Sequence, residues 1–80
     1  MNDWQIKDTK LFKEYKFKDY SEAFSFVSQV SDLAEKANHH PDISFGWGYV
    51  QIRLYSHDEK SITERDHKLA KQISSLSVVQ

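Results

Sequence analysis

Hydrophobic and polar positions change their period several times along the chain, and each change marks a new element. Between Trp4 and Lys18 apolar residues alternate loosely with lysines, and Leu11, Tyr15 and Phe17 share one parity. Alternation of this kind is typical of β-strands with one solvated face. The sequence therefore predicts one or two strands in this first segment.

A helical period follows from Ser21 onward. Apolar residues recur there every three or four positions, which predicts an amphipathic helix that ends near Asn38. Ser21 is the candidate N-cap, and Pro41 disfavours helical geometry at the residue before it. The apolar stripe consists of Ala23, Phe24, Phe26, Val27, Val30, Leu33, Ala34 and Ala37.

Strict alternation returns in the next segment. Val50, Ile52 and Leu54 occupy one face of a predicted strand, and the residues between them are polar or aromatic. A shorter strand is expected before it, from about Ile43 to Trp47. Gly46 and Gly48 then permit a tight reversal between the two strands.

A second helix is predicted to begin near Thr63, because Asp66 follows it by three residues, as in a capping box. Its buried stripe comprises Leu69, Ala70, Ile73 and Leu76. The element order β-β-α-β-β-α predicts an α+β fold with two layers. An antiparallel four-stranded sheet would carry both helices on one face, in a single domain over residues 1–80.

Composition narrows the function classes further. The 80 residues include no cysteine, which excludes a disulfide framework and a thiolate metal site. Eleven basic residues against twelve acidic ones give no general electrostatic reason to bind nucleic acid directly. The first residues do not resemble a signal peptide, and no apolar run is long enough for a membrane span. We expect a cytoplasmic protein without membrane contact.

Candidate chemistry centres on the turn His39-His40-Pro41 that follows the first helix. An isolated histidine pair is most often a solvated turn. Here the proline stiffens the turn, aromatic residues follow closely, and His57 stands at the end of the core strand. Histidine exchanges protons near neutral pH, so three histidines on loops and strand ends indicate acid/base chemistry.

These residues carry a family resemblance. Glu35-x-x-x-His39-His40-Pro41, then Trp47, His57 and Asp66, resembles the signature of the pterin-4a-carbinolamine dehydratases. The flanking blocks YKFKDYSEAFSFVSQVSDLAEKANHHPDI and YVQIRLYSHDEKSITERDHKLAKQI are similar to those of the family. In mammals one member is also a dimerisation cofactor of a homeodomain transcription factor. The resemblance spans nearly the whole chain, from Trp4 to Ile73.

The chain also departs from the family pattern. Lys60-Ser61-Ile62 stands where the family usually has a glycine pair, and Gly48-Tyr49 replaces a common Tyr-Asn pair. The N-terminal helix that often precedes the counterpart of Trp4 does not appear. No departure removes a histidine.

The resemblance implies dehydration of 4a-hydroxytetrahydrobiopterin to the quinonoid dihydropterin, in tetrahydrobiopterin recycling. It implies His39 and His57 as the acid/base pair, His40 as mainly a positioning group, and no cofactor or metal. The substrate-binding set it implies is Glu35, Asn38, Pro41, Trp47, Tyr55, Ser56, Asp58 and Asp66.

Structural roles compete for several of these residues. Glu35 also fits a solvated last helical turn, Trp47 a core aromatic, and Pro41 a purely structural turn residue. Asp66 fits a helix cap better than a catalytic group. His67 lies outside the motif and is expected at the surface.

Two other functions stay open on the sequence alone. A non-catalytic dimerisation or protein-interaction module would suit a small domain, but gives no reason for the histidine set. A histidine-only metal site is the weaker alternative, because the histidine spacing matches no familiar zinc pattern.

We also expect self-association. A small two-layer domain exposes the open face and an edge of its sheet, and Trp4, Tyr15 and Trp47 are candidates to leave apolar area uncovered. Family members resemble dimers that pair across sheets, and some double again. The prediction is a homodimer or a dimer of dimers, with the histidine site complete in each subunit.

Overall fold

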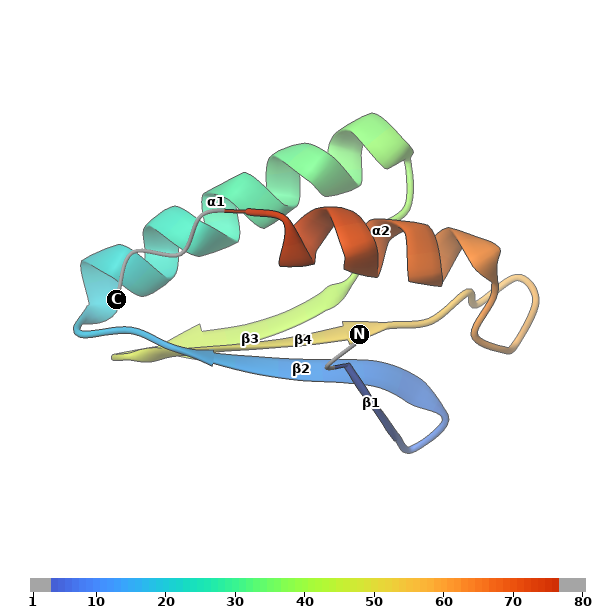
Figure 1. Cartoon of the computed structure of the whole chain (residues 1–80), viewed down its shortest axis with the longest axis horizontal. Coiled ribbons are helices and arrows are strands. Elements are labelled where there is room, and N and C mark those ends of the chain that lie inside the picture. The colour runs from blue at the N-terminus through green and yellow to red at the C-terminus, as the bar shows by residue number, and fades with distance from the viewer. Residues whose placement is uncertain (1–3, 77–80) are drawn as a thin grey trace.

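The computed structural model describes residues 4–76 and has two layers (Figure 1). Four strands form one antiparallel sheet, and both helices cover the same face of it. The strands lie in the order β1-β2-β4-β3. The predicted α+β fold and its element order are thereby confirmed. The elements are β1 (Gln5–Lys7), β2 (Lys10–Lys16), α1 (Tyr20–Ala37), β3 (Asp42–Gly46), β4 (Tyr49–Leu54) and α2 (Glu64–Ser74).

The first segment forms two strands joined by a tight turn. Asp8 and Thr9 both have positive φ, of 51° and 65°, as a two-residue hairpin turn requires. β2 and β3 both pair antiparallel with β4, so these two strands run parallel to each other. α1 makes the crossover between them.

The core lies between the central strand β4 and the two helices. Val50, Ile52 and Leu54 are fully buried, which confirms the predicted core face of this strand. From α1, Ala23, Phe26, Val30 and Ala34 pack onto the sheet, and from α2, Leu69, Ala70 and Ile73 do so. Both apolar stripes were predicted correctly at their centres.

The edges of the two apolar stripes were not predicted correctly. Ala37 is exposed, and Phe24 is 55% exposed because it lies at the side of α1, next to Phe45. Trp4, expected among the uncovered aromatics, is instead buried, and its indole N–H donates to Ser74 Oγ at 2.9 Å. Trp47 is 72% exposed in the turn after β3.

The cap of α1 differs from the prediction. The N-cap is Asp19 rather than Ser21, and its Oδ1 accepts a hydrogen bond from the Glu22 N–H at 2.9 Å. A carboxylate competes well with a hydroxyl at this position, and Asp19 can also reach the third residue of the helix. The helix therefore begins at Tyr20, two residues before the start that a cap at Ser21 predicts.

Candidate active site

The histidine turn begins where α1 ends. Asn38 is the C-cap in the left-handed conformation, with φ 51° and ψ 42°, and asparagine tolerates this region well. The backbone N–H of His39 still donates to the Ala34 carbonyl at 3.1 Å. The left-handed cap turns the chain away from the helix axis directly before the histidines.

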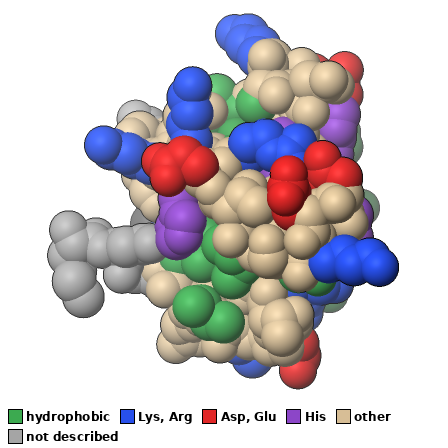
Figure 2. Space-filling view, turned by 90° about the vertical axis from the view of Figure 1, so that its right-hand side faces the viewer, with side chains coloured by type: hydrophobic (Ala, Val, Ile, Leu, Met, Phe, Trp, Pro, Cys, Tyr) green, Lys and Arg blue, Asp and Glu red, His purple; other side chains and the backbone are tan. Residues whose placement is uncertain are grey.

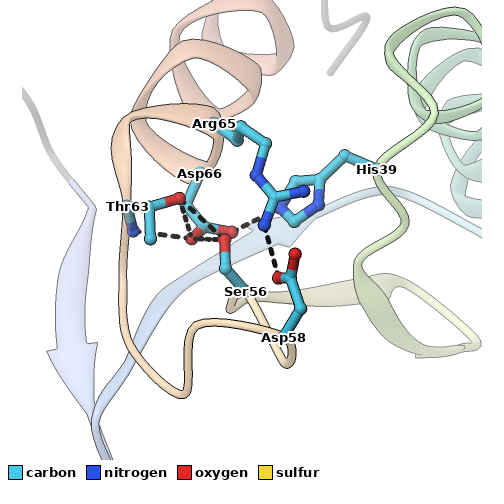
Figure 3. Close-up of polar contacts among 6 residues, drawn as sticks. All are labelled: His39, Ser56, Asp58, Thr63, Arg65 and Asp66. Carbon is cyan, nitrogen blue, oxygen red and sulfur yellow. Dashed lines mark hydrogen bonds and ion pairs between the residues drawn. The ribbon is translucent and has the colours of Figure 1, made fainter.

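A buried carboxylate holds the first histidine (Figure 3). Asp66 is fully buried, and its Oδ1 lies 2.6 Å from His39 Nε2. Its Oδ2 accepts hydrogen bonds from Ser56 Oγ at 2.7 Å and from the Thr63 N–H at 2.9 Å. We call His39, Ser56, Thr63 and Asp66 the Asp66 cluster. It connects the histidine turn, the end of β4 and the start of α2.

The protonation of this cluster follows from its hydrogen bonds. Burial raises the pKa of Asp66, but the hydrogen bonds from His39, Thr63 and Ser56 outweigh it, and the pKa is lowered from its usual value. An ionised carboxylate can only accept, so His39 Nε2 carries a proton and its N–H donates a hydrogen bond to Asp66. In the neutral ring, Nδ1 is then the basic nitrogen of His39.

The capping role expected for Asp66 is also present. Its side chain and the Thr63 N–H form the capping box of α2. The sequence suggested this cap, but not that the same carboxylate binds His39. Thr63 and Ser56 both form hydrogen bonds with the Asp66 carboxylate, and their hydroxyl oxygens lie 2.8 Å apart. One residue thus caps a helix and orients a histidine.

The second histidine has an exposed partner. His40 Nε2 lies 2.6 Å from Glu35 Oε2, and the two side chains are 55% and 75% exposed. Glu35 is in the last turn of α1, so the pair closes over the helix end. Pro41, partly buried, follows and leads directly into β3.

The third histidine lies in the turn after β4. An isolated bridge between Ser56 and Ser61 closes this turn, and His57 is exposed within it. Its ring meets the edge of Tyr55 with centroids 5.1 Å apart. Ser56 precedes His57 and bonds the same carboxylate as His39, so the two histidine segments are joined through Asp66.

Arg65 also lies at this end of the molecule. Its guanidinium forms an ion pair with Asp58 and lowers the pKa of that carboxyl through their hydrogen bond. Nothing in the sequence motif pointed to Arg65, although its place beside Asp66 in the first turn of α2 was a usable signal.

The structure gathers most of the predicted site residues at one end of the fold, where histidine, acidic and basic side chains share a face (Figure 2). The exception is Trp47. It lies at the β3–β4 turn, whereas His57 follows the other end of β4. Ser56 is fully buried, so its hydroxyl serves Asp66.

A cavity of about 380 Å³ opens beside His39, between α1 and α2. Its lining does not include His40 or His57. The residues that line it are Leu33, Lys36, Ala37, His39, Arg65, Lys68, Leu69 and Gln72.

Within residues 4–76, no group of three or more histidine, aspartate or glutamate side chains is arranged to hold a metal ion. No helix in the same range has the length and apolar character needed to span a membrane.

The fold and the site together define a two-layer α+β domain with paired histidines after its first helix and a partner aspartate on its second helix. The chain belongs to the family described as pterin 4 alpha carbinolamine dehydratase, whose model matches residues 1–76. Membership supports a function of the pterin carbinolamine dehydratase type.

Individual relatives agree with this family. A protein of Thermosynechococcus vestitus named "Putative pterin-4-alpha-carbinolamine dehydratase" is 42% identical over 76 residues, covering 95% of this chain and 80% of its own. One of the same name from Rubrobacter xylanophilus is 39% identical, covering 91% of this chain and 69% of its own.

Solved structures share the fold. A transcriptional coactivator/pterin dehydratase from Brucella melitensis superposes with a TM-score of 0.84 at 36% identity, covering 90% of this chain and 79% of its own. A pterin dehydratase-like protein described as a RuBisCO assembly factor in the α-carboxysome gives 0.72 at 29% identity, covering 90% and 83%.

Proposed function

We propose that this protein dehydrates a pterin 4a-carbinolamine by histidine acid/base catalysis. The observation that carries the proposal is the Asp66 cluster. It fixes the tautomer of His39 through a 2.6 Å bond and ties the segment that holds His57 to the same buried carboxylate. A fixed tautomer with one basic nitrogen suits proton transfer.

The reaction needs two proton transfers. One proton goes to the 4a-hydroxyl, which leaves as water when its C–O bond breaks. Another leaves N5, whose electron pair forms the C4a–N5 double bond of the quinonoid dihydropterin. One proton enters and one departs, so no net proton, electron or cofactor is consumed.

His39 and His57 are the proposed pair of proton donor and acceptor. His40, held by Glu35, positions the substrate. Further contacts are proposed from Asn38, Pro41, Tyr55 and Asp58, which lie on the same end of the fold. Asp66 and Ser56 act through His39, and Trp47 is left out because it lies at the other end of β4.

The first substrate to assay is 4a-hydroxytetrahydrobiopterin, and the proposed role is tetrahydrobiopterin recycling. His39→Ala and His57→Ala should each lower kcat on the order of 10²-fold or more, since each removes a proton-transfer group. The matched control is His67→Ala, because His67 is exposed and outside the Asp66 cluster. Full activity of the double variant of His39 and His57 would overturn the acid/base assignment.

A second candidate is a non-catalytic interaction module of the same fold. An exposed aromatic patch favours it: Tyr20 and Phe24, 51% and 55% exposed, lie 5.4 Å and 6.2 Å from the ring of Phe45. Patches of this kind mark protein contacts. The two similar structures named as coactivator and assembly factor support it as well. A direct dehydration assay separates the candidates.

We further propose at least a homodimer, with a complete histidine site in each subunit. The aromatic patch adjoins β3, an edge strand of the sheet with unpaired backbone groups. Sedimentation or light scattering at micromolar concentration tests this proposal. A well-folded monomer there would refute it.

A further inference from the structure

The cavity between α1 and α2 has a strongly unequal charge. Three cationic side chains line it, Lys36 from α1 and Arg65 and Lys68 from α2, and no acidic side chain of residues 4–76 does. Within residues 4–76, Lys36 and Lys68 form no ion pair. Arg65 is paired with Asp58, and both side chains are exposed. Among the described residues, the cavity therefore presents two ammonium groups without an ion-pair partner.

Apolar and polar side chains make up the rest of the cavity lining. Leu33, Ala37 and Leu69 supply apolar surface, Gln72 adds an amide, and His39 forms the wall shared with the Asp66 cluster. Hydrophobic atoms appear between charged side chains on this end of the molecule in Figure 2. The volume of about 380 Å³ lies in the range of small-molecule sites.

The cationic part of this lining suits the pterin ring less well than it suits an anion. The pyrimidine edge of a pterin alternates donors (the amino group and N3–H) with acceptors (O4 and N1), so it also needs acceptors, which the three cations do not supply and Gln72 supplies with its amide oxygen. Lysine and arginine are donors only. An oxyanion, in contrast, accepts from all of them, and lysine and arginine are the side chains with which proteins commonly bind phosphate.

We propose that this cavity binds the phosphate of a pterin whose side chain is a phosphoester. The inference rests on the proposed function, because a pterin reacting at His39 would place its side chain near the wall that His39 shares with the cavity. Lys36 and Lys68 contact the phosphate. Arg65 contributes its remaining N–H donors while Asp58 holds one of them.

The test compares two ligands that lack the 4a-hydroxyl and differ only by phosphate. Dihydroneopterin monophosphate should bind the wild-type protein on the order of tenfold more tightly than dihydroneopterin, measured by calorimetry at low salt. The preference should shrink as ionic strength rises, because ammonium–phosphate attraction in an open site is screened.

Variants locate the effect. Lys36→Gln and Lys68→Gln should each reduce the preference severalfold, and the double variant should bring it near one. Lys71→Gln is the matched control, since Lys71 is an exposed lysine on the same helix that does not line the cavity. An equal loss in Lys71→Gln would place the effect in the overall charge and overturn the proposal.

The remaining outcomes separate this inference from the proposed function. Equal affinity of wild-type protein for both pterins, together with an active dehydration reaction, overturns the phosphate site alone. Pyrophosphate binding without any preference for the phosphorylated pterin also overturns it. A phosphate preference in a protein inactive in dehydration supports the site and contradicts the catalytic proposal.

Discussion

The two adjacent histidines of the turn make the same bond in opposite surroundings. His39 and His40 each place Nε2 at 2.6 Å from a carboxylate oxygen. The His39 and Asp66 side chains are 10% and 0% exposed, whereas those of His40 and Glu35 are 55% and 75% exposed. The distance alone therefore does not decide how much either pair contributes to folding stability.

Burial decides the difference. Water screens the outer pair and can replace either partner, so its net contribution to stability is small. The Asp66 carboxylate is buried away from water, so its charge is stabilised by the hydrogen-bond donors around it. Removing one partner there leaves the others unsatisfied. The outer pair can rearrange, but the inner one holds three segments in place.

The largest expected effect is on folding stability. Asp66→Ala leaves His39, Ser56 and the Thr63 N–H without their acceptor, and it should lower the free energy of unfolding by about 3 kcal/mol or more. Urea titration followed by circular dichroism measures this. The matched change Glu35→Ala should remain within about 0.5 kcal/mol, since its side chain is solvated. Similar losses in both variants would remove the distinction between the pairs.

A double-mutant cycle isolates each bond. The coupling between His39→Ala and Asp66→Asn should be about 1.5–3 kcal/mol, as for a hydrogen bond to a charged group. The coupling between His40→Ala and Glu35→Gln should not exceed about 1 kcal/mol. Added salt should reduce the second coupling more than the first. A larger outer coupling would contradict the role assigned to burial.

Acid unfolding sharpens the same contrast. The folded pKa of Asp66 lies below the unfolded value of about 3.9, so its contribution is complete above that value and is lost as the pH falls through the folded pKa. Wild-type stability should therefore fall more steeply below about pH 4 than that of Asp66→Asn. Urea titrations at several pH values between about 5 and 2.5 measure the two slopes. Parallel slopes would show that Asp66 does not titrate in this way.

Much of the fold was predictable because period and burial coincide. Val50, Ile52 and Leu54 alternate in sequence and are all fully buried. The boundaries were less predictable, since they depend on which of several polar side chains reaches a free N–H. Asp19 caps α1 although Ser21 also had the right chemistry.

The site was predictable as a set of residue types, but not as a network. His39, His40 and His57 stand out in the sequence, yet nothing there indicates that the His39 side chain is mostly buried and that of His40 exposed. That difference depends on how α2 packs beside the turn, which brings Asp66 to His39 across 27 positions of the chain. Trp47 shows the reverse case, because strand direction places it far from the residues that precede it in the motif.

The smallest expected effect concerns Glu35→Gln, the mildest change to the outer pair. Glutamine keeps the length and one acceptor oxygen, so the free energy of unfolding should change by less than about 0.5 kcal/mol. If His40 positions substrate, KM for the carbinolamine should rise severalfold while kcat changes little, because the proton-transfer groups are intact. His67→Ala provides the baseline for an exposed histidine outside the site. A fall in kcat as large as that of His39→Ala would instead assign the outer pair a direct part in proton transfer.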